Sequence, residues 1–430
     1  MRSQEPAERI SPKRSEEPVR DLTADDLLGI GQSIGDRDVR LAIQRIVVEG
    51  LLSFGEITVF DFGRLNVLVG PNGSGKSNLI DCVRVLRYAP SDIQDTFKDS
   101  GFEDWLYKGL KKESGSAFME VTVTLPETRK EIRHQLKLGP GLKAGGRLEE
   151  VISSSHSEGE AEFYFIGSYR SGATITAAGT GKRQRERRMG ETEYDPFRSI
   201  LSQVRDVGQY PVITLLADLY TRCRIYSEWS FGRSSRLREP TPAGRSHTIL
   251  SDSMNDFALV LDGLKGSPTH EKIRDQLKEL KETYLDYVTR HIFGNVGLEL
   301  QEAPFEFPVP AKRLSDGTLR FLALAAILLN SNPPPVICLE EPELGMHPDM
   351  IRMVARMIAE CSEKTQVIVS THSENLLTAL QDDFDTLFAF DAGLNGSIVR
   401  RFSQDEYKQW REEHTLGELW TSGELGGNRW

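Results

Sequence analysis

The chain has 430 residues, 38% of them hydrophobic, and carries a formal net charge of −11 at pH 7. This length is enough for one large domain or two ordinary ones around a normal hydrophobic core. A net negative charge repels nucleic acid, so any contact with DNA requires a local basic patch rather than the surface as a whole.

The sequence predicts neither a membrane-spanning segment nor a disulfide framework. The longest apolar run, Phe321 to Leu329, is too short to cross a bilayer and is typical of a buried helix. The N-terminus is charged and has no hydrophobic signal region, so we expect a cytoplasmic protein without membrane contact. The cysteines lie far apart without C-x-x-C spacing, which predicts buried thiols at Cys82, Cys223, Cys338 and Cys361.

Residues 1–39 mix charges with Pro, Ser and Asp and show no sustained hydrophobic period, which predicts a flexible N-terminal tail. The next segment alternates apolar and polar residues and predicts two strands joined near Gly50 to Gly55. These strands lead into Leu65, Val67 and Val69, which alternate as in a buried strand.

A glycine-rich loop follows this strand and precedes a helical pattern. The segment GPNGSGKS fits G-x-x-x-x-G-K-[ST], in which backbone N–H groups surround phosphate oxygens at a helix N-terminus. Lys76 can reach the β- and γ-phosphates of ATP, and the Ser77 hydroxyl can ligate Mg²⁺. The predicted nucleotide-binding residues here are Gly70, Asn72, Gly73, Ser74, Gly75, Lys76, Ser77 and Asn78.

Four segments after the loop's helix have strand character and are separated by Gly, Pro or charged residues, which predicts an inserted antiparallel meander. They are residues 118–125, 131–138, 147–155 and 162–169. The basic run KRQRERR, Lys182–Arg188, follows them and is either a solvated loop or a contact for a phosphate backbone.

A second basic segment, Arg224–Arg238, interleaves arginines with Tyr226, Trp229 and Phe231. This pattern suits stacking on nucleotides, and it equally suits a packed loop with a charged rim. Further on, apolar residues recur at three- and four-residue steps between Ile273 and Ile292, which predicts one amphipathic helix of six to seven turns.

Two later strands end in polar side chains. The apolar run from Val336 to Leu339 is followed by Glu340 and Glu341, and a second run is followed by Ser370, Thr371 and His372. The carboxyl ends of strands in α/β sheets border the ligand crevice. We therefore assign Glu340 to Mg²⁺ and Glu341 to positioning the attacking water, with His372 hydrogen-bonding the γ-phosphate and that water.

Between the loop and the carboxylates, Ser315, Gly317 and Thr318 begin an apolar helix whose first N–H groups can bind an anion. Taken alone, the segment LSDGT also fits an ordinary helix N-cap. The order GPNGSGKS, LSDGT, ICLEEPELGMHP and STHS resembles the ABC-type ATPases of the RecF, SMC and OLD group, particularly their short "predicted ATPase" relatives. YSEWSFGR and the terminal LGELWTSGELGGNRW also resemble that short family.

This resemblance implies an α/β fold: an ABC-type P-loop NTPase head with an antiparallel β-meander lobe and a helical lobe. The segment from Lys76 to Ser315 has no room for a long coiled coil. The expected nucleotide-binding core comprises residues 40–126 and 305–400, with an inserted lobe at 127–304 and a C-terminal helix and tail at 401–430. The resemblance further implies a homodimer in which Ser315 and Gly317 act on ATP held by the partner.

We therefore expect an ATPase with ATP and Mg²⁺ that gates a DNA substrate or a partner effector, such as a separate nuclease, in DNA repair or anti-phage defence. Two other readings stay open. One is the nucleotide-binding subunit of a transporter, which the EEPELGMHP turn and the meander disfavour. The other is a non-hydrolysing ATP-dependent scaffold, which the presence of Glu341 and His372 disfavours.

Overall fold

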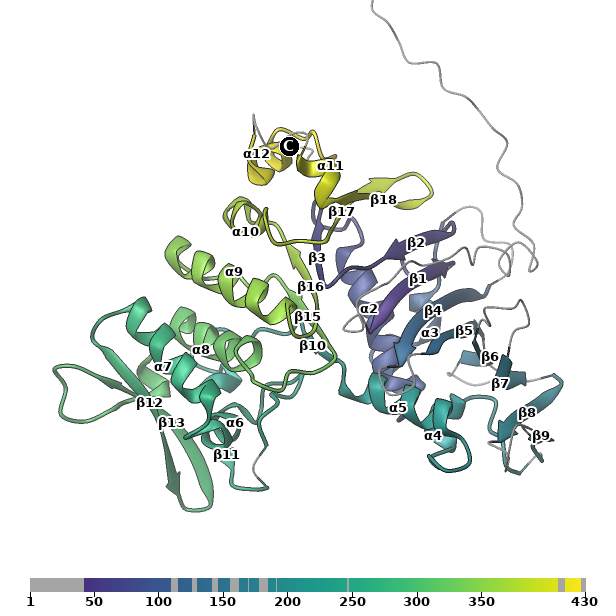
Figure 1. Cartoon of the computed structure of the whole chain (residues 1–430), viewed down its shortest axis with the longest axis horizontal. Helices are drawn as coiled ribbons and strands as arrows, with labels where there is room; N and C mark the ends of the chain where they lie inside the picture. The colour runs from purple at the N-terminus through teal and green to yellow at the C-terminus, as the bar shows by residue number, and fades with distance from the viewer. Residues whose placement is uncertain are drawn as a thin grey trace, which may run out of the picture. The chain divides into compact units, whose positions relative to one another are not determined.

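The computed structural model describes residues 42–109, 115–125, 130–140, 146–154, 162–168, 170–177, 185–190, 192–245, 247–408 and 414–426. The tail expected at residues 1–39 lies outside these ranges. A six-stranded sheet in the order β10-β15-β16-β3-β17-β18 forms the centre of this part of the chain (Figure 1). Its strands are β3 (Leu65–Val69), β10 (Arg224–Tyr226), β15 (Val336–Glu340), β16 (Gln366–Thr371), β17 (Thr386–Gly393) and β18 (Gly396–Ser403).

The first five strands of this core sheet are parallel neighbours, and only β18 is antiparallel to its neighbour β17. The register pairs Val69 with Thr371 and Glu340 with Ser370, so the carboxyl ends of β3, β15 and β16 lie at one edge. Each of these strands is almost entirely buried, as expected for a parallel sheet covered on both faces.

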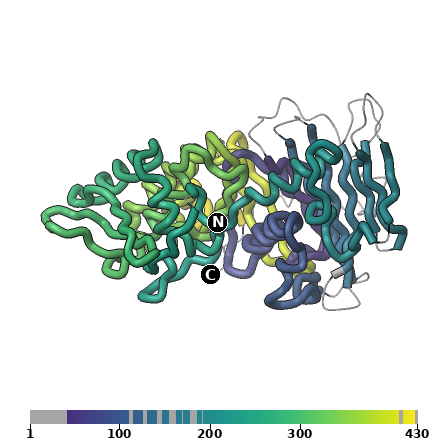
Figure 2. Tube along the Cα trace, turned by 90° about the horizontal axis from the view of Figure 1, so that it is seen from below, coloured from purple at the N-terminus to yellow at the C-terminus, as the bar shows by residue number. Residues whose placement is uncertain are grey.

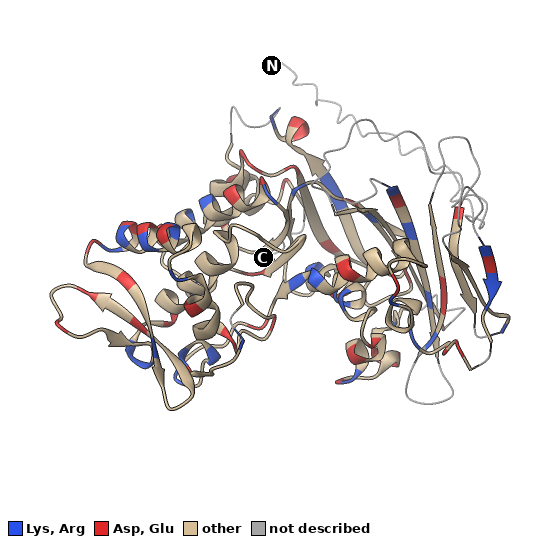
Figure 3. Ribbon diagram, turned by 60° about the horizontal axis from the view of Figure 1, so that its bottom comes forward, with Lys and Arg blue, Asp and Glu red and all other residues tan. Residues whose placement is uncertain are grey.

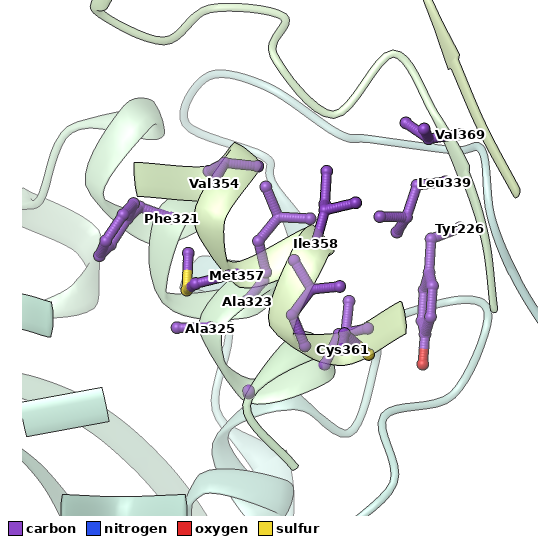
Figure 4. Packing of buried hydrophobic residues seen from close by; sticks show 14 of the residues in the cluster. Tyr226, Phe321, Ala323, Ala325, Leu339, Val354, Met357, Ile358, Cys361 and Val369 are labelled. Carbon is purple, nitrogen blue, oxygen red and sulfur yellow. The ribbon is translucent and has the colours of Figure 1, made fainter. Parts of the chain in front are cut away.

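Helices cover the two faces of the core sheet. Side chains of a strand alternate between faces, and the buried clusters separate accordingly. Leu339 and Val369 pack with helices α8 (Asp316–Leu328) and α9 (Pro348–Ser362), as Figure 4 shows. Cys338 and Ile368 pack with helix α2 (Lys76–Tyr88) on the opposite face. The further helices and turns on this sheet are α10 (Glu374–Leu380), α11 (Gln404–Lys408) and α12 (Leu416–Thr421).

A second, eight-stranded antiparallel sheet carries the meander, in the order β2-β1-β4-β5-β6-β7-β8-β9. Its strands are β1 (Ile43–Glu49), β2 (Thr58–Asp61), β4 (Ala117–Leu125), β5 (Lys130–Pro140), β6 (Gly146–Ser154), β7 (Glu162–Ser168), β8 (Gly172–Ala177) and β9 (Arg185–Arg188). Its buried face packs in one cluster with α2 and α5. The short elements beside it are η1 (Ile93–Phe97), α3 (Phe102–Trp105), α4 (Ile200–Gln203) and α5 (Pro211–Arg222).

A third, small sheet lies on the side of the core sheet opposite the meander sheet, together with the helices given below, as Figures 1 and 2 show. It is built on the hairpin β12 (Tyr284–Ile292) and β13 (Asn295–Glu302), with the short strands β11 (Thr241–Pro242) and β14 (Val309–Pro310). Its helices and turns are η2 (Arg236–Arg238), α6 (Phe257–Leu264), α7 (Pro268–Leu280) and η3 (Ala311–Arg313).

The prediction of one helix from Ile273 to Ile292 is wrong in its second half. Helix α7 ends at Leu280, Lys281 is extended, and β12 then pairs with β13 from Tyr284 onward. The apolar residues 284, 288 and 292 are four positions apart, and four is a multiple of the strand period as well as about one helical turn. Pairing with β13 decides the ambiguity in favour of a strand.

The domain boundaries expected from the sequence also differ from the observed sheets. Strand β10 lies inside the expected inserted lobe at 127–304 but belongs to the core sheet, where it pairs with β15. Strands β1, β2 and β4 fall inside the expected core at 40–126 but belong to the meander sheet. β18 extends the core sheet past residue 400, where a helix and tail were expected. A three-residue strand such as β10 is too short to show a hydrophobic period.

No helix among the described residues is long and apolar enough to cross a membrane. The longest helix in this part of the chain is α9, with 15 residues, so none has the length of an SMC-type coiled coil. All four cysteines are free and buried, as the sequence predicted.

Candidate functional site

The phosphate loop connects β3 to α2 at the edge where the parallel strands end. Gly73 and Gly75 have φ values of 76° and 109°, a region that residues with a Cβ rarely adopt. A Cβ on Gly73 would meet no atom within 4 Å, so the open side of the loop is free to take a ligand. A Cβ on Gly75 would lie 2.2 Å from Ser397 Oγ and 2.6 Å from Ser53 Oγ, so this glycine permits close packing of the loop itself.

Lys76 is the first residue of α2 and is only 5% exposed. Its Nζ donates hydrogen bonds to Gly70 O at 2.8 Å and to Pro71 O at 3.1 Å, so the ammonium group lies over the loop. Burial lowers the pKa of Lys76 to about 8, and the nearby Glu341, Glu340 and Glu343 oppose this shift. Lys76 makes no salt bridge to a carboxylate among the described residues, and a buried cation in this state is suited to an anionic ligand.

Two serines that sequence reasoning missed support the loop from behind. The predicted ligand-binding residue Asn78 donates through Nδ2 to Ser53 Oγ at 2.7 Å. Ser397 Oγ lies 2.6 Å from Ser53 Oγ and 2.6 Å from Ser74 O. Asn78 is therefore engaged in holding the loop against the β1–β2 connection and β18. No local signal marked Ser53 or Ser397, because both reach the loop only through the packing of distant strands.

Other loop residues face the open side or remain unpaired. Asn72 is exposed, and Ser74 Oγ is buried without a hydrogen-bond partner among the described residues. An unpaired buried hydroxyl beside a row of loop N–H groups fits the oxygen-rich phosphates of a nucleotide. The exposed Asn72, the unpaired Ser74 hydroxyl and the loop N–H groups are therefore suited to a nucleoside triphosphate.

Ser77 and Glu340 meet across the edge of the core sheet, with Ser77 Oγ donating a hydrogen bond to Glu340 Oε1. Burial is the largest effect on the carboxyl of Glu340 and raises its pKa, against the hydrogen bond from Ser77. A hydroxyl and a carboxylate oxygen are ligands that Mg²⁺ prefers. The described residues contain no cluster of three or more His, Cys, Asp or Glu side chains for a metal, so phosphate oxygens and water would complete the coordination.

Glu341 and His372 form a second pair, with His372 Nε2 lying 3.1 Å from Glu341 Oε1. Glu341 has a φ of 45°, and its N–H donates to Ser370 O at 2.9 Å. Burial and the charge of Lys76 lower the pKa of His372, and Glu341 opposes them. A neutral imidazole can accept or donate one proton, so this pair can orient a water molecule.

Glu343 is a third carboxylate that sequence reasoning missed. It is 8% exposed, and its Oε1 accepts hydrogen bonds from Thr371 Oγ1 and from the His372 N–H, the latter at 3.2 Å. Its Oε2 has no hydrogen-bond partner among the described residues, and burial raises its pKa. Glu343 thereby ties the segment after Glu341 to the end of β16. Its position in EEPELG was the only sequence signal.

Ser315 is the N-cap of α8 and accepts a hydrogen bond from the Thr318 N–H at 3.0 Å. Its Oγ also lies 2.7 Å from Thr318 Oγ1. A Cβ on Gly317 would lie 3.3 Å from Gly345 O, in the turn after the carboxylates. Because α8 and α2 cover opposite faces of the core sheet, the structure does not bring Ser315 together with Lys76 on one face.

The two basic segments differ from their expected form. Arg185–Arg188 is the edge strand β9 rather than a loop, and all four of its residues are exposed. Figure 3 shows basic and acidic residues together on the strand at the edge of the meander sheet. Lys182 and Arg183 lie outside the described residues. In the second segment, Arg238 is 8% exposed and pairs with Asp316 at 2.6 Å, so it is unavailable to nucleic acid. Arg233 and Arg236 are exposed.

This fold and site define the class of protein: an ABC-type P-loop NTPase head of the SMC- and RecF-like group. Residues 65–378 match the family described as "AAA domain, putative AbiEii toxin, Type IV TA system", and the chain belongs to that family.

Known relatives agree on the fold. The chain is 33% identical over 85 residues to the chromosome partition protein Smc of Myxococcus xanthus, covering 20% of this chain but only 7% of that protein. It resembles the crystal structure of an Smc head bound to the C-winged helix domain of ScpA, with a TM-score of 0.53 and 15% identity over 85% of this chain and 99% of that one. An Smc head derived from Pyrococcus furiosus gives a TM-score of 0.52 and 12% identity, over 86% of this chain and 99% of that one.

Proposed function

We propose that the protein is an ATPase that converts ATP and water to ADP and phosphate, and that ATP holds two copies of the chain together. The observation that carries the proposal is the Glu341–His372 pair at the ends of β15 and β16, beside the buried Lys76. In the register of the core sheet these strands are neighbours of β3, which leads into the phosphate loop.

Each group has a distinct part in hydrolysis. Lys76 exchanges its loop carbonyls for the β- and γ-phosphates, and the loop N–H groups surround the same oxygens. Glu341 accepts a hydrogen bond from the attacking water and orients it toward the γ-phosphorus, while His372 holds Glu341 and the γ-phosphate. Ser77 and Glu340 would hold Mg²⁺, which when bound neutralises charge on the phosphates. The water oxygen bonds to the γ-phosphorus while Glu341 accepts a proton from the water, and the bond between the γ-phosphorus and the oxygen that bridges to the β-phosphate breaks, so that ADP leaves with that oxygen.

The position of Ser315 supports the proposed dimer. The N-terminus of α8 can bind an anion, but α8 covers the opposite face of its own core sheet from α2. We infer that Ser315, Gly317 and Thr318 act on ATP held by Lys76 of a second copy. The γ-phosphate held by the loop of one chain would then contact the N-terminus of α8 in the other chain, and hydrolysis would remove this contact.

The dimer is proposed to gate a DNA substrate or a separate effector protein, such as a nuclease, in DNA repair or antiviral defence. The relatives named as chromosome partition proteins support a DNA substrate, and the family description that names a toxin supports an effector protein. The exposed arginines of β9 offer a local basic strand for a phosphate backbone, although Arg187 is paired with Glu193. Titration of the protein with DNA, with and without ATP, decides between a DNA and a protein partner.

The test of the ATPase is a comparison of wild type with Lys76→Ala. Wild type should release phosphate from ATP in the presence of Mg²⁺, whereas the variant should lose ATP binding because the charge directed at the phosphates is gone. Calorimetry measures the affinity, and thermal unfolding without ATP shows that the variant is folded. Unchanged affinity in a folded Lys76→Ala variant contradicts the site. Binding without turnover in wild type supports the non-hydrolysing scaffold instead.

A further inference from the structure

Arg320 on α8 is a buried cation that the proposed reaction does not use. It is 2% exposed, and its guanidinium carbon lies 4.3 Å from the ring centroid of Trp229 and 5.1 Å from that of Phe231. Both aromatic residues belong to the segment 229–238, which follows β10. Because burying a charge is costly, an arginine in an otherwise apolar helix requires specific partners.

Those partners are backbone carbonyls of the turn that carries the hydrolytic carboxylate. Arg320 Nη2 donates to Glu341 O at 2.5 Å, and Nη1 donates to Leu344 O at 2.7 Å. Trp229 Nε1 donates to Glu340 O at 2.9 Å. The carbonyls of both adjacent carboxylate residues are therefore held by one aromatic–arginine cluster, which comprises Arg320, Trp229 and Phe231.

The backbone at Glu341 needs such support. Its φ of 45° lies in the left-handed region, which is unfavourable for a residue with a Cβ. Pro342 follows it, and a residue before proline favours extended conformations. Three hydrogen bonds hold the backbone of Glu341: its N–H donates to Ser370 O, and its carbonyl accepts from Arg320 Nη2 at 2.5 Å and from the Leu344 N–H at 3.2 Å. Removing Arg320 would leave the Glu341 carbonyl with only the longer bond from Leu344 and would also free the Leu344 carbonyl, so the turn could shift and move the Glu341 carboxylate away from His372.

The same segment holds the beginning of α8. The Gly232 N–H donates to Asp316 Oδ2 at 2.9 Å, and Arg238 Nη2 pairs with Asp316 Oδ1 at 2.6 Å. Arg238 also donates to the carbonyls of Ala311 and Leu314, at 2.9 and 2.6 Å. Segment 229–238 therefore bonds through Trp229 to the backbone carbonyl of Glu340, and through Gly232 and Arg238 to Asp316 at the N-terminus of α8.

We propose that Arg320 is a positioning residue that sets the orientation of Glu341, and that the aromatic–arginine cluster makes Glu341 and the N-terminus of α8 move as one unit. The proposal rests on the ATPase activity proposed above. A γ-phosphate that contacts the start of α8 would thereby also align the carboxylate that orients the water.

The first test is Arg320→Met, which keeps most of the side-chain volume and removes both donors. Turnover should fall by about 10- to 100-fold, because a carboxylate displaced by about 1 Å loses its alignment with water. The KM for ATP should stay within about threefold, because Lys76 and the loop are unchanged. Trp229→Phe, which keeps an aromatic ring but removes the bond to Glu340 O, should give a smaller loss of kcat. Arg352→Met, on an exposed arginine of α9, should leave both constants unchanged.

A double-mutant cycle separates positioning from general damage. If Arg320 acts through Glu341, then Arg320→Met should reduce the slow residual turnover of Glu341→Gln by less than about threefold. A full additional loss in the double variant, or normal kcat in a folded Arg320→Met, overturns the proposal. If Arg320→Met does not fold, normal kcat in Trp229→Phe overturns it. Absence of hydrolysis in wild type refutes the ATPase itself, and the proposal about Arg320 with it.

Discussion

Glu341 has both an unusual backbone conformation and the carboxylate that is proposed to act on water. Its backbone is left-handed, its carbonyl accepts from Arg320, and its carboxylate lies 3.1 Å from His372. Glu343, two residues on, bonds to Thr371 and to the His372 N–H. Glu343 therefore holds the end of β16, whereas Glu341 is proposed to contact the attacking water.

At this scale, Glu341→Gln should retain ATP binding while turnover falls by about 10² or more, because the amide keeps the shape but cannot accept a proton. Phosphate release and calorimetric affinity measured on the same preparation check this expectation. Glu306→Gln, at an exposed carboxylate before β14, serves as the matched control. Hydrolysis at the wild-type rate by Glu341→Gln would remove Glu341 from the reaction.

At the scale of elements, the phosphate loop depends on glycines for two different reasons. Gly75 is enclosed by Ser53 and Ser397, whereas the space around a Cβ on Gly73 is open to 4 Å. Both glycines have a positive φ, so replacing either with a residue that has a Cβ places that residue in an unfavourable backbone conformation. A Cβ on Gly73 would point into the open space that the phosphates are proposed to occupy, whereas a Cβ on Gly75 would collide with the two serines.

Gly73→Ala should therefore fold with a loss of about 1–2 kcal/mol from its backbone conformation, and it should bind ATP more weakly because its methyl group enters the phosphate space. Thermal unfolding with and without ATP measures both effects, since a ligand stabilises in proportion to its affinity. Gly266→Ala is the control: Gly266 has a φ of 71° and equally open surroundings, away from the loop. An ATP-induced rise in Tm equal to that of wild type in Gly73→Ala would contradict the assigned phosphate position.

At the scale of the whole molecule, the helices that begin at Lys76 and after Ser315 cover opposite faces of one sheet. A monomeric mechanism and a mechanism in which ATP holds two chains together therefore predict different activities for mixtures of two variants. Ser315→Arg places a bulky cation at the start of α8 and should abolish hydrolysis, while ATP binding through Lys76 persists.

Mixing Ser315→Arg with Lys76→Ala gives each mixed dimer one composite site with an intact phosphate loop and an intact α8 N-terminus. Partial activity should return if one such site can act alone, and ATPase rates across mixing ratios measure it. Sedimentation of Glu341→Gln should show an ATP-dependent dimer. A monomer in ATP that hydrolyses at a concentration-independent specific rate would refute the dimeric mechanism.

The sequence by itself determined the local chemistry of the nucleotide site and the fold class around it. The phosphate loop lies between a short apolar strand and a helix, and Glu340–Glu341 follow another apolar strand directly. His372 follows a third such strand. Carboxyl ends of parallel strands share one edge of a sheet, so groups at these positions are predicted to meet without knowledge of any long-range contact.

Only the tertiary structure decided which distant segments support that site. Apolar residues at 284, 288 and 292 satisfy a helix and a strand alike, and pairing with β13 selects the strand. Arg320 bonds to carbonyls 21 and 24 residues further along the chain, and nothing beside it in the sequence names those acceptors. Backbone carbonyls are the same at every position, so which of them a buried arginine reaches is settled only when helices and sheets pack together.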